Sequence, residues 1–161
     1  MAGKTAVVSG VIEMLKRGHA EVNGFFEEFE SAKGKEQADI VATVIMEIEI
    51  HADLEEKLIY PAIREAIDKD DIMNEAIEEH HLVHVLIKEL EHLTPKDDAF
   101  QAKVRVLGEL MKHHIEEEEG EMFPRAQASH IDWEALETAV MKRKEALVSK
   151  FTRGKQSVAK A

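Results

Sequence analysis

The sequence predicts an all-α protein, namely an antiparallel up-down-up-down four-helix bundle with an additional C-terminal helix. Glycine and proline are sparse, with 8 and 3 in 161 residues, and aromatic residues make up 5%. Ala, Leu, Ile, Glu and Lys dominate, as is typical of helical domains. Apolar residues also recur in alternating steps of three and four along successive stretches, which short breaker-rich stretches separate. Four long helices with short connections favour an antiparallel bundle.

Each predicted helix has a recognisable boundary. The predicted helices span residues 7–29, 37–67, 72–93, 100–124 and 132–151. Gly34 lies in the loop that ends the first helix, and Pro61 is expected to kink or end the second. We expect Pro124 to close the fourth helix and Asp132 to cap the start of the fifth. Residues 1–130 are therefore predicted to form the bundle, and residues 131–161 a C-terminal helix with a basic tail.

One motif occurs twice in the chain. His51-x-x-x-Glu55 runs on to Tyr60-Pro61, and a second copy, separated by about sixty residues, begins at His114 and ends at Phe123-Pro124. A His and a Glu four residues apart lie one turn apart on the same face of a helix, so both can reach one metal ion. The repeat predicts two halves related by a pseudo-twofold axis.

Polar residues stand in the apolar stripes where the helical period demands Leu or Val. These residues are His19, His51, Glu55, His80, His84, His114 and Glu118. A buried charge or imidazole without a partner costs on the order of several kcal/mol. A single such His is more often a hydrogen-bonded core residue, and a single His-x-x-x-Glu pair is more often an exposed ion pair. Their coincidence in four helices favours a shared metal centre instead.

Other titratable and aromatic residues are expected to have structural roles. His81, His92, His113 and His130 lie off the stripes and are expected to face solvent. Glu119 is the rival of Glu118, because a slip of one residue would turn it inward. Tyr60 and Trp133 are expected to serve in core or cap packing. Asn23 occupies the position of His84 in the first half, so the two halves offer unequal ligand sets.

The available donor types narrow the metal. The chain has no Cys, so the site must use imidazole and carboxylate, which suits Fe, Mn or Zn. If all seven residues bind two ions, with both Glu carboxylates and one oxo or hydroxo group bridging, one coordination position stays open. An open position on a redox metal in an apolar bundle suits dioxygen or peroxide, whereas zinc prefers four ligands and cannot donate electrons.

The sequence resembles the hemerythrin-like, or HHE cation-binding, family between Val8 and Ala126. Besides the two His-x-x-x-Glu blocks, the stretches VIEMLKRGHAEVNGFFEEFE and EEHHLVHVLIKELEHL resemble the first and third helices of that family. The resemblance implies a four-helix bundle with a non-haem di-iron centre. It carries over, as metal ligands, His19, His51, Glu55, His80, His114 and Glu118.

Two positions bear on the function that the resemblance implies. His84 matches the second His of the His-x-x-x-His helix in oxygen-carrying hemerythrins. Those carriers place a final Asp five residues after the last His, whereas Glu118 comes four residues after His114. The leading hypothesis is a di-iron protein that binds dioxygen for storage, delivery or sensing. The alternatives are a catalase-like or ferroxidase-like enzyme, iron buffering, or a purely structural metal, so the sequence leaves open whether the chain is an enzyme.

Whether His84 binds metal decides between these functions. If it binds, the single vacancy permits end-on binding of dioxygen and little else. If it stays free, two vacancies arise, and chemistry with a bridging peroxide becomes easier.

Charge and hydropathy limit the partners. The net charge of −12 makes a nucleic-acid partner unexpected, although the stretch 142–161 is basic and is expected to form a solvated helix with a frayed end. The longest apolar run, near Ile40–Met46, is far too short to span a membrane. There is no sign of a signal peptide. We expect a cytoplasmic protein that is a monomer or a weak homo-oligomer.

Overall fold

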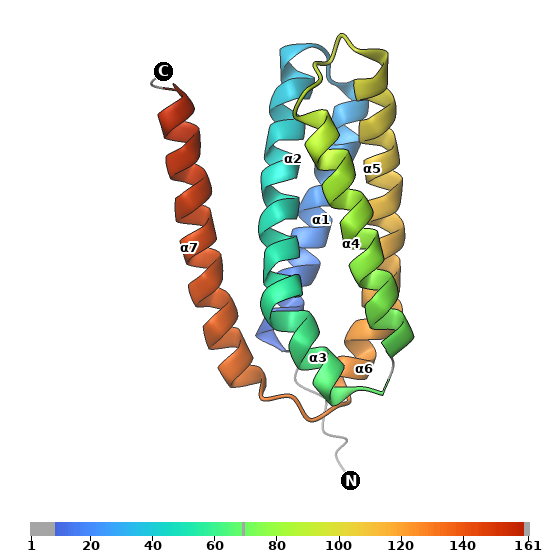
Figure 1. The fold of residues 1–161 in the computed structure, drawn as a ribbon, viewed down its shortest axis with the longest axis vertical. Helices are drawn as coiled ribbons and strands as arrows, with labels where there is room; N and C mark the ends of the chain where they lie inside the picture. Colours follow the sequence, from blue (N-terminus) through green and yellow to red (C-terminus); the bar gives the residue numbers. More distant parts are fainter. Residues whose placement is uncertain (1–8, 69, 160–161) are drawn as a thin grey trace.

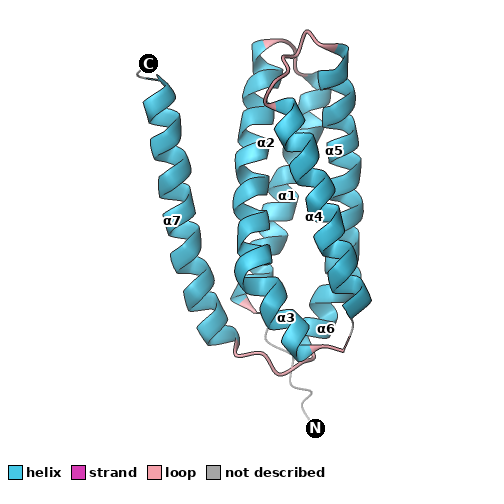
Figure 2. Ribbon diagram, in the orientation of Figure 1, coloured by secondary structure: helices cyan, strands magenta, loops and turns pink. Residues whose placement is uncertain are grey.

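The architecture is that of an antiparallel helical bundle with one additional helix. The computed structural model describes residues 9–68 and 70–159, and within them it contains helices and no strands (Figure 2). The four long helices are α1 (Gly10–Ser31), α2 (Lys35–Leu54), α4 (Asp70–Leu90) and α5 (Asp98–Glu117). They alternate in direction along the bundle axis (Figure 1), which confirms the predicted up-down-up-down topology.

Local sequence fixes the first helix boundaries. The Ser9 hydroxyl accepts a hydrogen bond from the backbone N–H of Val11 at 3.2 Å, which caps the free N-terminal end of α1. Gly34 precedes α2 with a φ of 55°, a left-handed conformation that glycine adopts without a steric penalty. The turn between α1 and α2 is therefore short, and the two helices pack side by side.

The second and fourth predicted helices each contain a π-helical segment. η1 (Glu55–Ile59) joins α2 to α3 (Tyr60–Ala66), and η2 (Glu118–Met122) joins α5 to α6 (Phe123–Gln127). The prediction that Pro124 closes its helix is wrong, because α6 continues through Gln127. A proline has no N–H to donate, and the wider π turn before it tolerates the missing hydrogen bond. Pro61 lies in the same position of α3.

A polar layer divides the interior into two apolar clusters. The lower cluster includes Leu15 of α1 and Ala76 of α4, and the upper cluster includes Val22 and Val83 of the same two helices. His19 lies between Leu15 and Val22 along α1, and the other buried ionisable side chains come from the corresponding turns of the neighbouring helices. The bundle therefore holds its polar groups between two hydrophobic layers, which keep water away from them.

The last helix, α7 (Trp133–Ala159), packs on the outside of the bundle. Asp132 Oδ1 accepts a hydrogen bond from the backbone N–H of Ala135 at 3.1 Å, which confirms the predicted N-cap. Val140 is fully buried against the lower cluster, and Arg143 donates two hydrogen bonds to the carboxylate of Asp53 on α2. Figure 1 shows α7 beside α2, with its C-terminal end directed away from the bundle.

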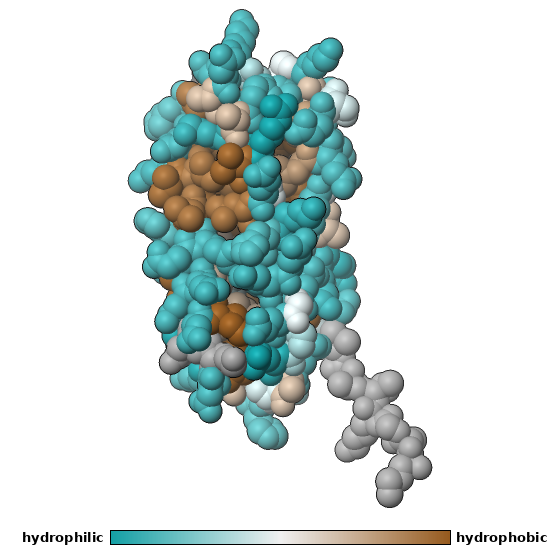
Figure 3. Space-filling view, turned by 90° about the vertical axis from the view of Figure 1, so that its right-hand side faces the viewer, coloured by the Kyte–Doolittle hydropathy of each residue, from teal (hydrophilic) through white to brown (hydrophobic). Residues whose placement is uncertain are grey.

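The surface is mostly hydrophilic. Figure 3 shows the face opposite α7, where a large hydrophobic area in the upper half and smaller ones elsewhere interrupt the polar surface. Exposed apolar side chains of α4 and α5 include Leu82, Val85 and Val106. No helix within the described residues is both long enough and apolar enough to cross a membrane. The side chains of Lys155 and Lys160, part of the predicted basic tail, lie outside the described residues.

Candidate metal centre

The buried imidazoles and carboxylates meet in two adjoining groups. The first half-site consists of His19, His51 and Glu118, and the second consists of Glu55, His80, His114 and Glu118. Within each group the potential ligand atoms all lie within 4.8 Å of one another. Each half-site takes one His from α1 or α4 and one from α2 or α5. The predicted pseudo-twofold arrangement is therefore present in the geometry.

The two carboxylates connect the half-sites. Glu118 Oε2 lies 3.2 Å from His19 Nε2, and Glu118 Oε1 lies 2.7 Å from His114 Nε2. Glu55 Oε1 lies 3.2 Å from His51 Nε2 and 3.5 Å from His80 Nε2. Each carboxylate thus contacts one imidazole of each half. This is the arrangement in which carboxylates can bridge two metal ions.

The imidazoles face one another in pairs. Nε2 of His19 lies 3.1 Å from Nε2 of His51, and Nε2 of His80 lies 3.1 Å from Nε2 of His114. A nitrogen lone pair directed at a second nitrogen lone pair needs either a proton or a cation between them. One cation in each half-site would satisfy both nitrogens of a pair together with a carboxylate oxygen.

The hydrogen bonding of the Glu55 and Glu118 oxygens indicates whether these residues fit metal ions. Within the described residues, both carboxylate oxygens of Glu55 and Oε2 of Glu118 are buried and make no hydrogen bond, although imidazole nitrogens lie 3.2–3.5 Å from two of these oxygens. Native proteins rarely leave buried carboxylate oxygens without partners, because the cost is several kcal/mol. A pair of divalent or trivalent cations would supply the missing partners, and the nitrogen and oxygen donors suit iron, manganese or zinc. The residues therefore fit a two-metal centre.

In the metal-free protein, the pKa values of the buried ligands show that the imidazoles hold protons beside ionised carboxylates. Burial alone lowers the pKa of His114, but the Glu118 carboxylate outweighs it and raises this pKa to about 11. Burial also opposes the charge on His80, yet the nearby carboxylates of Glu55 and Glu56 raise its pKa to about 9. The pKa of Glu118 is held well below its usual value, because His114 outweighs the effect of burial. Metal binding must displace these protons.

Carboxylates also lie behind three of the four imidazoles. His114 donates from Nδ1 to Glu79 Oε1 at 3.0 Å, which directs its Nε2 toward the centre. His80 Nδ1 lies 3.6 Å from Glu56 Oε2, and His19 Nδ1 lies 3.8 Å from Glu119 Oε1. Outer carboxylates of this kind set the tautomer of a metal-binding imidazole and increase its basicity.

Tyr60 is a site residue that the sequence reasoning assigned to packing. Its hydroxyl donates a short hydrogen bond to Glu118 Oε1 and lies 3.2 Å from both His80 Nε2 and His114 Nε2. The reason is the π-helical segment η1, in which the N–H of Tyr60 bonds to the carbonyl of Glu55, five residues earlier. The wider turn brings Tyr60 to the face that carries Glu55. In the sequence, the aromatic-Pro pair that follows each motif was the signal that could have indicated a role for Tyr60 in the site.

The equivalent residue of the other half has no hydroxyl. Phe123 follows Glu118 by five residues, as Tyr60 follows Glu55, and its ring stacks on His19 with 6.0 Å between centroids and 4° between planes. Tyr60, from the first half of the chain, therefore contacts the second half-site, and Phe123, from the second half of the chain, contacts the first half-site. The second half-site receives an additional oxygen ligand candidate, whereas the first receives only an apolar ring.

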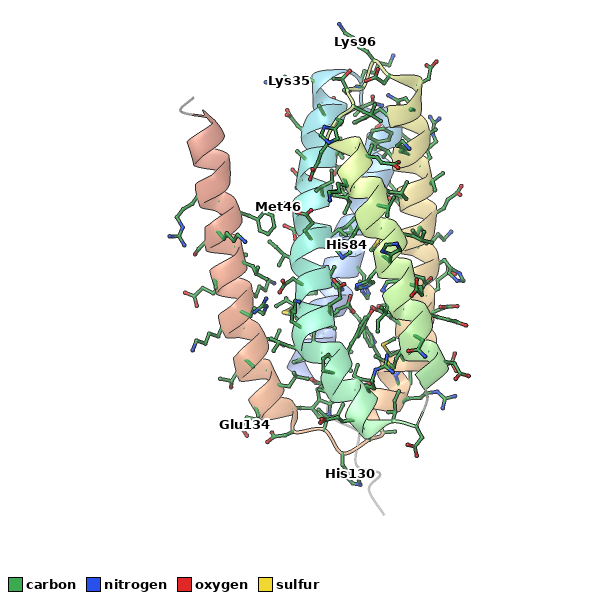
Figure 4. All side chains as sticks on the ribbon, viewed as in Figure 1. Lys35, Met46, His84, Lys96, His130 and Glu134 are labelled. Carbon is green, nitrogen blue, oxygen red and sulfur yellow. The ribbon has the colours of Figure 1, made fainter. Side chains whose placement is uncertain are left out.

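The structure brings together six of the seven sequence-predicted ligands and places His84 elsewhere. The His84 side chain is 43% exposed, and its Nε2 lies 3.1 Å from Glu56 Oε2. Figure 4 marks its place at mid-height on α4. The space next to the His80 and His114 nitrogens, which a third imidazole would need, is occupied by the Tyr60 hydroxyl. His84 contacts Glu56 instead of the centre. Together, His80 and His84 lower the pKa of Glu56 to about 2.

The other residues singled out in the sequence lie as follows. Glu118 is buried and Glu119 is partly exposed, so the period of the helix turns Glu118 inward. Trp133 packs against the lower cluster, as expected. The histidines expected to face solvent are all exposed: His81, His92, His113 and His130.

Comparisons with known proteins agree with this architecture. The crystal structure of a hemerythrin HHE cation binding domain-containing protein from Mycobacterium kansasii superposes with a TM-score of 0.72. The two chains are 19% identical, and the match covers 91% of this chain and 93% of that one. At this identity the likeness establishes the fold alone.

A curated relative matches only part of its own length. A protein of Nostoc sp. strain PCC 7120, named DNA nickase, is 22% identical over 112 residues, which is 69% of this chain and 32% of the relative. The chain therefore spans about a third of that protein. The family model described as hemerythrin HHE cation binding domain matches residues 10–126, which include the whole four-helix bundle and every residue of both half-sites. The chain belongs to the hemerythrin HHE cation binding domain family.

Proposed function

We propose that this protein holds two non-haem iron ions in the two half-sites and that the centre consumes peroxide. The observation that carries the proposal is the pair of carboxylates that connect the half-sites, Glu55 and Glu118: three of their four oxygens are buried and make no hydrogen bond within the described residues. Four imidazoles complete the two half-sites. Iron accepts this mixed donor set and, unlike zinc, changes oxidation state during a reaction.

Tyr60 favours peroxide over reversible dioxygen binding. Its hydroxyl lies within 3.2 Å of two ligand imidazoles, at the place where His84 would have to stand in an oxygen carrier. A phenolate is a hard, anionic ligand and stabilises ferric over ferrous iron. Reversible dioxygen binding begins from the ferrous state, so a phenol at this place works against it. Peroxide disproportionation needs no external reductant, because two peroxide molecules give one dioxygen and two waters.

The residues of the chain have separate tasks in this proposal. Glu55 and Glu118 hold the two half-sites at a fixed separation, and Glu79 fixes the tautomer of His114. The two apolar clusters exclude bulk water. Glu56 lies between His80 and the exposed His84, so its carboxylate can orient the outer side of a ligand imidazole. When bound, the iron ions supply the electron transfer to and from peroxide.

Reversible dioxygen binding is the second candidate. It is supported by the apolar ring of Phe123, which stacks on His19 in the first half-site. If iron were held there, an apolar surrounding of this kind would disfavour the release of charged products of dioxygen reduction. We also propose that the body of the chain has no nucleic-acid partner, on the basis of its net charge of −12. The name of the Nostoc relative describes a protein about twice as long as this chain.

Metal content and peroxide decay test the proposal together. Protein grown with iron is expected to contain about two iron ions per chain and to release dioxygen from peroxide. His114→Ala is expected to lose both properties, whereas His81→Ala, an exposed neighbour of the second half-site, keeps both. One iron or none, with zinc in its place, would contradict the proposal. A loaded protein that ignores peroxide but gains and loses a visible oxygen adduct under vacuum would establish the second candidate.

A further inference from the structure

The two half-sites differ in what stands behind the second imidazole. In the second half, the residue before His80 is Glu79, and its carboxylate accepts the hydrogen bond from His114 Nδ1. In the first half, the residue before His19 is Gly18. A Cβ atom added to Gly18 would lie 3.1 Å from His51 Nδ1. The position that supplies a carboxylate in one half therefore carries no side chain in the other, and the His51 ring lies close against Gly18.

Gly18 and His51 both line a pocket at the surface. The pocket has a volume of about 100 Å³ and is lined by residues of α1, α2 and α7, among them Gly18, His51, Leu54 and Lys144. A volume of this size holds several water molecules or a ligand of two or three heavy atoms. The pocket reaches the imidazole of His51 itself, and a small solute can therefore approach the first half-site from the outside.

Exposure shows the same difference between the halves. The side chain of His51 is 15% exposed, whereas that of His114, its counterpart, is 3% exposed. Tyr60 fills the inner side of the second half-site, and Glu79 covers its outer side. The first half-site has neither of these groups. Among the four imidazoles of the centre, His51 is the one that is not fully buried.

The rim of the pocket carries charge from two elements. Arg17 of α1 and Lys144 of α7 stand on the rim together with Glu21 and Glu47. The α7 helix is held at this place by Arg143, the neighbour of Lys144, through its ion pair with Asp53. The mouth of the pocket is therefore partly built by the additional helix, and a cation from that helix faces any solute that enters.

We propose that Gly18 opens an access route by which a small ligand, of the size of dioxygen, peroxide or azide, reaches the His19–His51 side of the centre. The second half-site is closed by Glu79 and Tyr60 and takes no exogenous ligand by this route. The inference rests on the proposed function for its ligand. The route itself is a property of the metal-free chain and can be tested without metal.

Gly18→Ala tests the route, and Gly24→Ala is its matched control. Both glycines are in α1, but a Cβ at Gly24 meets nothing within 4 Å. In the metal-free protein, diethyl pyrocarbonate modifies accessible imidazoles, and peptide mass spectrometry reports the rate at His51. Gly18→Ala is expected to slow modification of His51 at least about fivefold, since a methyl group narrows the approach to Nδ1. Gly24→Ala is expected to leave the rate unchanged. Equal rates in both variants would overturn the proposal.

A second variant tests the route without touching a ligand residue. Lys144→Glu reverses one rim charge, and Lys142→Glu makes the same change at an exposed position of α7 outside the pocket. With the iron-loaded protein and azide, Lys144→Glu is expected to slow association about fivefold at low salt, with the difference fading at high salt. Lys142→Glu is expected to have little effect. Equal association rates for the two variants would also overturn the route.

The outcomes separate the route from the function. If Gly18→Ala protects His51 in the metal-free protein but the loaded wild type neither binds azide nor consumes peroxide, the route stands and the proposed function fails. If the loaded protein consumes peroxide at the same rate in wild type and Gly18→Ala, with iron content unchanged, the function stands and the route is wrong.

Discussion

Tyr60→Phe is the substitution that discriminates best between a site residue and a packing residue. The side chain is buried, so a Phe ring keeps its apolar contacts and removes only the hydroxyl. That hydroxyl donates to Glu118 and lies against His80 and His114. Burial, together with the charges of Glu118 and Glu55, holds the pKa of Tyr60 well above its usual range. In the metal-free protein the group therefore remains a hydrogen-bond donor.

The expected loss of stability follows from that single hydrogen bond. A hydrogen bond to a charged group contributes about 1.5–3 kcal/mol, and its removal here leaves a buried carboxylate with one partner fewer. A change of about 2 kcal/mol in the free energy of unfolding lowers the melting temperature of a chain of this length by about 4–8 °C. If Tyr60 only filled space, the change would be small, because Phe and Tyr differ little in volume.

Thermal unfolding and visible absorption together measure the effect. Metal-free Tyr60→Phe is expected to melt below the wild type by the amount above. Iron-loaded wild type is expected to show a phenolate-to-iron charge-transfer band that the variant lacks. The reciprocal variant, Phe123→Tyr, offers a hydroxyl to the other half-site and serves as a comparison. Equal melting temperatures and equal spectra for wild type and Tyr60→Phe would refute the placement of the hydroxyl in the centre.

Three other predictions follow from the same geometry. Glu118→Gln is expected to lose iron on dialysis and Glu119→Gln to keep it, since Glu118 joins the half-sites and Glu119 does not, and equal iron contents would mean that Glu118 does not bridge. The metal-free protein is expected to melt at lower temperature as pH rises from 7 toward 9.5, because protonated His80 and His114 have folded-state pKa values of about 9 and about 11, above the unfolded value of about 6.5. Their stabilisation is complete below the unfolded value and is lost through the folded ones, so a melting temperature that is flat over this interval would contradict the assignment. Gly34→Ala is expected to reduce the free energy of unfolding by about 1 kcal/mol, because a φ of 55° strains a residue with a Cβ, and urea titration measures the change.

The fold could be predicted from the sequence because its signals repeat. The apolar stripes, the short loops and the two copies of the motif all point to one bundle, and the Asp132 cap marks the last helix. The ends of the helices were harder to place. Pro124 is a strong stop signal by itself, but the preceding π turn removes the clash that makes proline a helix breaker.

The composition of the centre was only partly predictable. Helical periodicity brings His80 and His84 to one face, but it does not say how far along the axis a ring can reach. Tyr60 lies five residues after Glu55, which the period of an α-helix places on a different face. A π turn changes that phase locally. The π turn that brings Tyr60 to the centre could therefore be identified only from the structure.

The π-helical segments make the chain unusually sensitive to its own length. Each segment acts as a one-residue insertion, so the helix after η1 or η2 is rotated by about 100° from the phase of the helix before it. Deleting a single exposed residue such as Lys57 would restore the ordinary turn and rotate Tyr60 and Ile63 together away from the interior. A one-residue deletion in this segment would then remove the Tyr60 hydroxyl from the centre, although every histidine of the centre would still be present in the chain.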